Sequence, residues 1–259
     1  MSMKVISLGL GVQSTAMYLM SSKNMIERAD HAIFADPGAE STRTYEILEY
    51  LQDWAKYNDG IPIHVTNEKN LYKGLLENKS YTGRRAVLVP AFTGNGTGML
   101  MRQCTTDYKI FPVLQTIRKI QGIKPRKRMK PVDIWLGISL DEIERMKISQ
   151  QSNLTYVYPL IDGRMTRGDC LRIFKRYNFP IPPKSSCVFC PYHSDKHWKD
   201  MKDNSRKDWE TAVQVDDEIR WNTKLREPIY LHRSCVPLKN VQFADQQELF
   251  MCEEGFCGL

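Results

Sequence analysis

The sequence lacks long hydrophobic runs. Its longest apolar stretches have the length of a strand, far short of the ~20 residues that a membrane-spanning helix needs. It also lacks the basic region, apolar stretch and small-residue cleavage site of a secretory signal. We therefore expect no membrane partner and a cytoplasmic location. Internal repeats and low-complexity segments are missing as well, which excludes a repeat array.

The composition is that of an ordinary globular protein. With 259 residues, of which 42% are hydrophobic, the chain can build one sizeable core or a core with an appendage. The net charge of +7 at pH 7 permits a polyanionic partner without proving one. Seven cysteines are an odd number, and without a secretory signal we interpret them as ligands or reactive thiols, not as a disulfide framework.

Residues 1–150 alternate between strand-like and helix-like patterns. Such alternation predicts a parallel sheet covered on both faces, with ligands at the carboxyl ends of the strands, where the strand order reverses. Strands are expected at residues 3–8, 31–36, 61–66 and 132–139, and helices at residues 13–25, 41–58, 109–121 and 140–149.

Residues 151–259 have a different pattern. Helical patterns at residues 165–177 and 209–224 flank residues 180–193, which proline and cysteine make irregular. We therefore expect an α/β domain with a doubly wound parallel sheet over residues 1–150, which binds a nucleotide. A C-terminal helical extension over residues 151–259 would carry a cysteine-bearing loop.

Residues 7–15, SLGLGVQST, form the first turn from strand to helix. Such a turn has free backbone N–H groups and the positive end of a helix dipole. Gly9 and Gly11 would let the backbone approach a phosphate closely, and the hydroxyls of Ser14 and Thr15 can donate hydrogen bonds to it. A plain tight turn would use the same small residues, so both interpretations stay open. The GxxxxGK[ST] phosphate loop is excluded, since no lysine follows at the required position.

Residues 9–15, GLGVQST, are similar to the SGGxDS pyrophosphatase loop (PP-loop) of the adenine nucleotide α-hydrolase-like superfamily, especially of its phosphoadenosine-phosphosulfate reductase family. Leu10 and Gln13 stand where that loop has glycine and aspartate. Later segments resemble the family's FxDTGxxxxxTYE, RxC…K…P and GxRxxES…R motifs in the same order. These segments are residues 34–48, 102–113 and 136–147.

The resemblance implies an adenine nucleotide α-hydrolase-like fold that binds ATP together with Mg²⁺. Catalytic roles would go to Asp36, Lys109 and Cys257. The Lys-Ser-Ser segment, residues 184–186, could contact the phosphate that is bound at the loop of residues 9–15. The nucleotide-binding residues that the resemblance implies are Ser7, Gly9, Gly11, Gln13, Ser14, Thr15, Asp36, Gly38 and Arg145.

Cys187 and Cys190 form a CxxC motif followed by proline. Two thiolates at this spacing can bind one metal centre, although a redox dithiol or two ordinary buried cysteines would show the same spacing. Family members with a 4Fe–4S cluster use cysteines from this region and from the segment of Cys104. The resemblance therefore implies a 4Fe–4S cluster on Cys104, Cys187 and Cys190. Structural zinc, with a fourth ligand from the tail or from His193, is the alternative.

The tail holds Cys252 and Cys257. Its last three residues, Cys-Gly-Leu, resemble the C-terminal ECGLH element of sulfonucleotide reductases, in which the cysteine attacks sulfur. Cys257 is therefore a candidate nucleophile, a candidate fourth metal ligand, or part of a frayed end.

Five cations lie within the seven residues 124–130. A solvated loop between a helix and a strand would look the same as a contact to a nucleic acid backbone. The candidate contacts are Lys124, Arg126, Lys127, Arg128 and Lys130.

The leading functional hypothesis is an enzyme that cleaves ATP between the α- and β-phosphates and adenylates an oxygen of an acceptor. A sulfur species, on the cluster or on Cys257, would then displace AMP. The basic chain favours tRNA or DNA as acceptor, and a sulfur donor or thiol reductant is also needed. One alternative is a phosphoadenosine-phosphosulfate reductase. The other is a non-catalytic module that binds a nucleotide and a metal within a larger complex.

Overall fold

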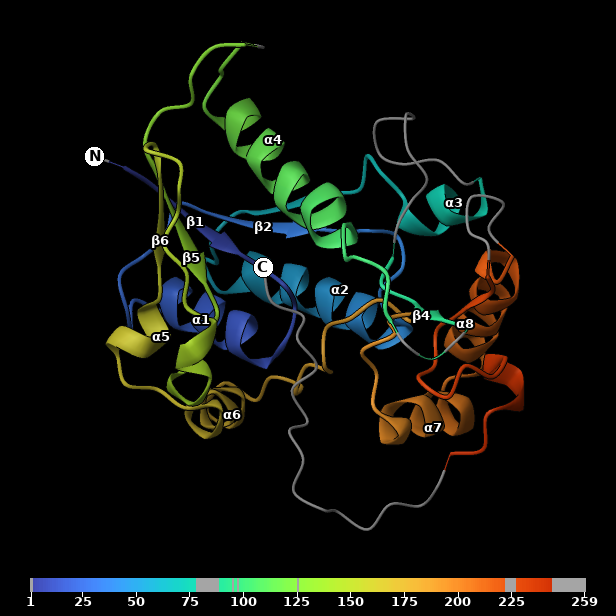
Figure 1. Ribbon diagram of the computed structural model, residues 1–259. Coiled ribbons are helices and arrows are strands. Elements are labelled where there is room, and N and C mark those ends of the chain that lie inside the picture. The colour runs from blue at the N-terminus through green and yellow to red at the C-terminus, as the bar shows by residue number, and fades with distance from the viewer. Residues whose placement is uncertain are drawn as a thin grey trace. The chain divides into compact units, whose positions relative to one another are not determined.

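The computed structural model describes residues 2–77, 89–94, 96, 98–124, 126–221 and 227–243 (Figure 1). The chain divides into two compact units, which we call the sheet unit and the cysteine unit. The sheet unit comprises Met1–Ala35, Arg43–Glu68 and Phe111–Ser185, and the cysteine unit comprises Asp36–Thr42, Lys69–Ile110 and Ser186–Leu259. This division does not follow the boundary at residue 150 that the sequence suggested, because residues 151–185 pack with the sheet.

The sheet unit is built on five parallel strands in the order β3-β2-β1-β5-β6. The strand order reverses between β1 and β5, since the chain moves outward from β1 to β3 and then returns to the other side. This confirms the predicted doubly wound α/β fold, in which only β6 was not expected. The strands are β1 (Met3–Ser7), β2 (His31–Ala35), β3 (Ile63–Thr66), β5 (Val132–Leu136) and β6 (Leu154–Val157).

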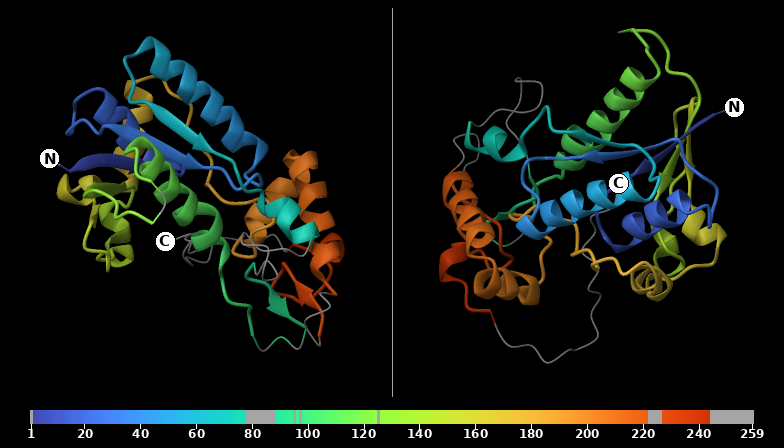
Figure 2. Two further views of the ribbon diagram at one scale, coloured as in Figure 1. Left: turned by 90° about the horizontal axis from the view of Figure 1, so that it is seen from above. Right: turned by 180° about the vertical axis from the view of Figure 1, so that it is seen from behind.

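Helices cover both faces of this sheet, because successive strand side chains point to opposite faces (Figure 2). Ile6, Phe34 and Trp135 pack in one apolar cluster with α1, α2 and α6. Val5 and Ile134 pack in another cluster with α4. The helices of this unit are α1 (Val12–Ser22), α2 (Thr42–Tyr57), α4 (Phe111–Ile120), α5 (Pro159–Asp162) and α6 (Arg167–Arg176).

The helix expected at residues 140–149 is only a 3₁₀ segment, Leu140–Arg145. Glu142 departs from helical geometry, with φ −121° and ψ 26°. The backbone N–H of Leu140, which has no partner within its own segment, donates to the carbonyl of Met165 at 2.8 Å. The segment therefore lies against the start of α6.

The cysteine unit consists mainly of helices and irregular segments. Trp198, Phe189 and Leu231 are fully buried members of its apolar core. None of the described helices is long and apolar enough to cross a membrane. The elements are α3 (Leu71–Leu76), β4 (Phe92–Thr93), a π-helix (Thr106–Ile110), α7 (Asp195–Asn204), α8 (Arg206–Ile219), β7 (Ile229–Tyr230) and a 3₁₀ turn (Leu238–Asn240).

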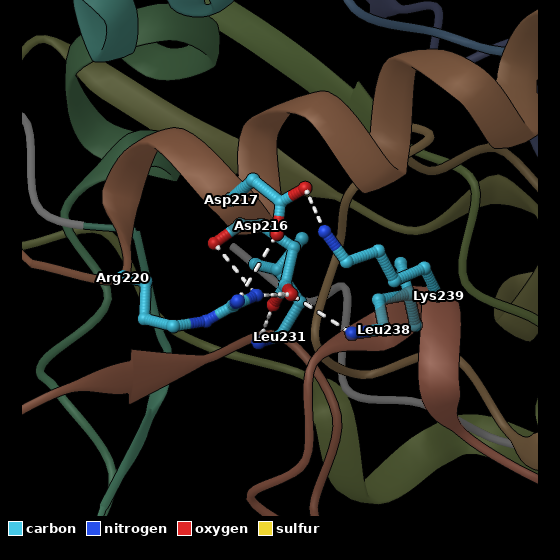
Figure 3. Close-up of polar contacts among 6 residues, drawn as sticks. All are labelled: Asp216, Asp217, Arg220, Leu231, Leu238 and Lys239. Carbon is cyan, nitrogen blue, oxygen red and sulfur yellow. Dashed lines mark hydrogen bonds and ion pairs between the residues drawn. The ribbon is translucent and has the colours of Figure 1, made fainter.

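Asp216 on α8 organises the segment that follows this helix (Figure 3). Its side chain is buried, and its two oxygens accept hydrogen bonds from the backbone N–H groups of Leu231 and Leu238, each at 2.9 Å. Arg220 forms an ion pair with the same carboxylate. One buried aspartate therefore fixes β7 and the 3₁₀ turn to α8, because each hydrogen bond to a charged acceptor contributes about 1.5–3 kcal/mol.

Candidate functional site

The candidate phosphate loop, residues 8–11, leads from the carboxyl end of β1 into α1. Residues 137–139 lead away from the carboxyl end of the neighbouring strand β5. The strand order reverses between these two strands. In open α/β sheets a ligand binds at this position, so the fold itself places the loop where a ligand is expected.

The loop has an unusual backbone at Leu10. This residue is fully buried and has φ +57°, in the left-handed region that is unfavourable for a side chain such as leucine. The family loop has glycine here, for which this conformation costs nothing. Left-handed residues in turns help successive N–H groups to point into one concavity that binds an anion.

The first turn of α1 has donors to offer an anion. Gly11 is the N-cap, and no side chain caps the helix there. The Ser14 hydroxyl lies 3.4 Å from the Gly11 carbonyl oxygen, which makes a weak hydrogen bond that a better acceptor can replace. The positive end of the helix dipole therefore stays open to a negative ligand.

Gly137 approaches this turn too closely to carry a side chain, whereas Gly11 makes only an ordinary contact. A Cβ on Gly137 would lie 2.7 Å from both the Cα and the backbone N of Ser14. A Cβ on Gly11 would lie 3.7 Å from the Cβ of Ser185, which is ordinary contact and brings the predicted Lys-Ser-Ser segment alongside the loop. The sequence analysis assigned Gly137 no role, although it lies in a segment that resembles the family.

Gln13 connects the loop to two other segments of the sheet unit. Its side chain is mostly buried, and its amide Nε2 donates to the Ser139 hydroxyl at 3.4 Å. Its Oε1 accepts a hydrogen bond from Arg167 Nη1 at 3.3 Å. Arg167 is a residue that sequence reasoning missed, because it is 154 positions away and lies in no recognised motif.

Arg145 and Ser7 complete the predicted nucleotide residues of the sheet unit. Arg145 Nη1 lies 2.6 Å from the Glu142 carboxylate, so its charge is already paired. Ser7 is the last residue of β1 and lies between Ile33 of β2 and Leu136 of β5. Ser7 is therefore placed at the site by its strand.

Asp36 and Gly38 belong to the cysteine unit and form a tight turn. The backbone N–H of Gly38 donates to Asp36 Oδ1 at 2.7 Å. Gly38 has φ +67°, and a Cβ there would lie 2.2 Å from the side-chain nitrogen of Asn70. Asn70 in turn caps α3 through the N–H of Lys73. Both predicted residues thus have a structural role in this turn, whatever they bind.

The Cys187–Cys190 loop is held together by His193. The Cys187 carbonyl accepts hydrogen bonds from the Cys190 N–H at 3.0 Å and from His193 Nε2 at 2.9 Å. The His193 N–H donates to the Cys190 carbonyl at 3.1 Å. His193 Nε2 is therefore engaged with a backbone carbonyl, so Nδ1 is the ring nitrogen that could bind zinc in this arrangement.

A buried ion pair connects the Cys104 segment to the Cys187 segment. Lys109 Nζ lies 3.0 Å from Glu40 Oε1, and the Glu40 side chain is completely buried. Glu40 also pairs with Cys187 in an isolated antiparallel bridge. Side chains directly opposite each other in such a pair lie on the same side, with Cβ atoms about 5 Å apart. Lys109 is thus joined to the bridge partner of Cys187.

A second contact connects the same segments. The guanidinium of Arg102 lies 5.7 Å from the ring centre of Tyr192, within the range of a cation–π interaction. Cys104 and Cys187 both pack against the apolar core of the cysteine unit. The segment of Cys104 is therefore attached on both sides of this cysteine to the segment that carries the CxxC motif.

These contacts do not complete a metal site. Within the described residues, no three His, Cys, Asp or Glu side chains form a group that could hold a metal ion. Cys252 and Cys257 lie outside the described residues, so the predicted tail nucleophile and fourth ligand have no described position. We derive no chemical step through a metal.

Cys170 differs from the other described cysteines. It is fully buried on α6, and burial, followed by the nearby carboxylates of Asp141 and Asp169, raises the pKa of its thiol to about 12. A thiol of this kind is unreactive at neutral pH. Cys170 is therefore a packing residue of the sheet unit.

The basic segment after α4 points to solvent. All five predicted cations are exposed, whereas Met129 between them is buried and anchors the segment. Arg118 Nη2 donates to the carbonyls of Lys124 at 3.0 Å and Lys127 at 2.7 Å. No ion pair joins any of the five to a carboxylate in the part of the chain that the structure describes. Their charge is therefore available to a polyanion.

No protein-family model and no curated protein matches the sequence. Two solved structures are similar to this chain at 12% identity and a TM-score of 0.43. One is the phosphate complex of a phosphoadenylyl-sulfate reductase from Candida auris, covering 70% of this chain and 74% of that one. The other is the U34-tRNA thiolase NcsA from Methanococcus maripaludis with its 4Fe–4S cluster, covering 83% and 72%.

Proposed function

We propose that this chain is an enzyme that binds ATP at the loop of residues 8–11 and cleaves it between the α- and β-phosphates. The observation that supports this most directly is the N-terminus of α1, which lacks a side-chain cap and lies where the strand order reverses between β1 and β5. Gly137 packs against the backbone of Ser14, and Gly11 carries no side chain that would keep a phosphate away from the backbone N–H groups. The sequence resemblance to PP-loop proteins supports the same assignment.

In this proposal the loop performs binding and charge stabilisation. The backbone N–H groups of the first turn and the Ser14 hydroxyl would hold the phosphates, with Mg²⁺ accompanying the nucleotide. An acceptor oxygen would attack the α-phosphorus, the bond to the β-phosphate oxygen would break, and pyrophosphate would leave as the acceptor's proton passes to solvent. The helix dipole would stabilise the negative charge that develops on the leaving group. A sulfur species would then displace AMP from the acceptor.

We propose Cys104, Cys187 and Cys190 as ligands of an iron–sulfur cluster, with zinc as the alternative. The two contacts between their segments and their shared apolar core support this proposal. Anaerobic purification with iron and sulfide counts tests it. Brown protein that becomes colourless when any of the three is changed to serine is expected, because an alkoxide is a poor match for iron. Colourless protein with stoichiometric zinc would contradict it.

We propose a nucleic acid, tRNA or DNA, as the acceptor. The five exposed cations of residues 124–130, free of described ion pairs, support this. Each phosphate that is neutralised on duplex DNA contributes roughly −0.9 to the slope of log K against log salt. Filter binding against tRNA and duplex DNA should show a steep slope, which a variant with three of the cations neutralised flattens by about 2 to 3. An unchanged slope would remove the segment from the binding surface.

The reaction itself is tested by its products. The full chain is incubated anaerobically with ATP and tRNA, and separately with phosphoadenosine phosphosulfate and a thiol reductant. Pyrophosphate from ATP supports the proposal. Sulfite from the sulfonucleotide would replace it with the reductase alternative, in which Cys257 is the nucleophile. If neither product forms, the remaining alternative is a non-catalytic module that binds a nucleotide.

A further inference from the structure

Arg167, the first residue of α6, has a positively charged side chain beside the phosphate loop. Its exposed guanidinium donates to Gln13 Oε1 at 3.3 Å, and this amide is neutral. No ion pair between the Arg167 side chain and a carboxylate is present among the described residues. An exposed cation whose hydrogen-bond partner is a neutral loop residue is available to an anion at that loop.

The two carboxylates near Arg167 contact its backbone or another arginine, and not its guanidinium. The Asp141 carboxylate accepts the backbone N–H of Arg167 at 3.1 and 3.2 Å. Asp169 caps α6 through Thr166 and forms an ion pair with Arg172. The backbone of Arg167 is therefore fixed, whereas its side chain is left to reach toward the loop.

Arg145, the cation that the family resemblance implies, is in the opposite situation. Its guanidinium lies 2.6 Å from the Glu142 carboxylate, which is buried. A buried carboxylate that loses its cation is costly, so Arg145 cannot turn to a ligand without leaving Glu142 unpaired. Of these two arginines, Arg167 is therefore the one whose side chain forms no ion pair with a carboxylate among the described residues.

The first turn of α1 contains a second sign of a missing ligand. The Thr15 hydroxyl is completely buried and has no hydrogen-bond partner among the described residues. A buried hydroxyl without a partner costs free energy, which an acceptor oxygen at this turn would recover. Together with the mostly buried Gln13 amide, this hydroxyl places polar groups next to the apolar core residues Leu10 and Val12.

We propose that Arg167 binds the phosphate chain of the nucleotide at the loop and takes the role that the resemblance gives to Arg145. This inference rests on the proposed nucleotide site. It identifies Arg167 as the residue that binds the negative charge of the substrate. When a ligand is present, a phosphate oxygen replaces Gln13 Oε1 as the acceptor for Arg167. Since Arg167 would contact the phosphates and not the base, the protein should also bind inorganic pyrophosphate alone.

The test is a calorimetric titration of the full chain with pyrophosphate and with a non-hydrolysable ATP analogue. Arg167→Met should weaken both ligands by at least about tenfold, the loss of one charge-assisted hydrogen bond. Arg172→Met is the matched control, because Arg172 is exposed on the same helix and is paired with Asp169. It should bind both ligands within about twofold of wild type.

A second measurement does not depend on a variant. Phenylglyoxal modifies accessible arginines, and mass spectrometry with and without pyrophosphate shows which of them a ligand protects. Protection of Arg167 but not of Arg172 is expected. If wild type and Arg167→Met bind equally while Arg145→Met loses affinity, Arg145 is the arginine that binds the phosphates and our assignment is overturned. If wild type binds neither ligand, the proposal of a nucleotide site is wrong. This outcome differs from equal binding by wild type and Arg167→Met, which would contradict only the role of Arg167.

Discussion

The two units bring their candidate residues together in different ways. In the sheet unit the loop lies at the ends of β1 and β5, so the regular sheet places it and close packing shapes it. In the cysteine unit residues 36–42, 102–110 and 187–193 are joined by an ion pair, a ring contact and a histidine. The first arrangement should therefore be sensitive to added volume, and the second to the loss of a polar partner.

Removing the cation of the buried ion pair should have the largest effect. Lys109→Met leaves the Glu40 carboxylate buried without its partner. Breaking such a pair costs 3–5 kcal/mol, and because Lys109 is one-third exposed we expect about 3 kcal/mol. The free energy of unfolding in urea at pH 7 measures this loss.

Two controls sharpen that prediction. The double variant Glu40→Gln, Lys109→Met should regain more than half of the loss, since no buried charge remains. Lys119→Met removes the cation of a surface pair with Glu68, whose partners are both more than half exposed, and should cost less than about 1 kcal/mol. Equal losses in Lys109→Met and Lys119→Met would show that the cysteine unit does not depend on its ion pair.

Adding one methyl group at the phosphate loop should have the next largest effect. Gly137→Ala places a Cβ 2.7 Å from the backbone of Ser14 and should lower the free energy of unfolding by about 2 kcal/mol. Gly168→Ala is the control, because its nearest contact is an ordinary 3.5 Å to the Thr166 hydroxyl. A Gly137→Ala protein as stable as wild type would contradict the close packing of β5 against α1.

The cysteines should differ in reactivity between the units. At pH 8 the Cys170 thiol, with a pKa of about 12, carries almost no thiolate, and it is also buried. Iodoacetamide labelling followed by mass spectrometry should therefore leave Cys170 unmodified while Cys235, which is partly exposed, reacts. Equal labelling of the two in folded protein would show that α6 opens readily.

The smallest expected effect concerns pH and the edge of the sheet. His64 Nε2 lies 3.1 Å from His31 Nδ1, and burial, followed by the charge of His31, lowers the pKa of His64 below 6.5. The unfolded chain then binds more protons than the folded one, so stability falls as pH decreases through about 6.5. His64→Gln should lose less stability than wild type between pH 7.5 and 5.5 in urea titrations. Parallel losses would exclude His64 as the cause.

The sequence pattern predicted most of the sheet unit, because four short apolar runs alternate along the chain with longer helix-like segments, as in a parallel sheet buried on both faces. It missed β6, because residues 154–157 lie in the region that was assigned to the helical C-terminal extension. The loop was predictable from its glycines and hydroxyls. Arg167 was not, because its contact with Gln13 exists only after α6 has packed near the end of β5.

In the cysteine unit the residues were predictable and their connections were not. The CxxC spacing and the resemblance around Cys104 marked the cysteines. The contact of Lys109 with Glu40 joins residues 69 positions apart, and no local pattern encodes it. The role of His193 as the residue that closes the CxxC loop also needed the folded backbone, since its sequence position equally suited a metal ligand.

The most direct test of the account is nucleotide binding at the loop. Calorimetric titration of a non-hydrolysable ATP analogue is compared between wild type and Gly11→Val, with circular dichroism to establish that both are folded. A Cβ at Gly11 makes only an ordinary 3.7 Å contact with Ser185, so the variant should fold. We predict that wild type binds and that Gly11→Val loses at least ~2 kcal/mol of binding free energy, because the phosphate can no longer reach the backbone N–H groups. Unchanged affinity in a folded variant would contradict the assignment of this loop as the nucleotide site.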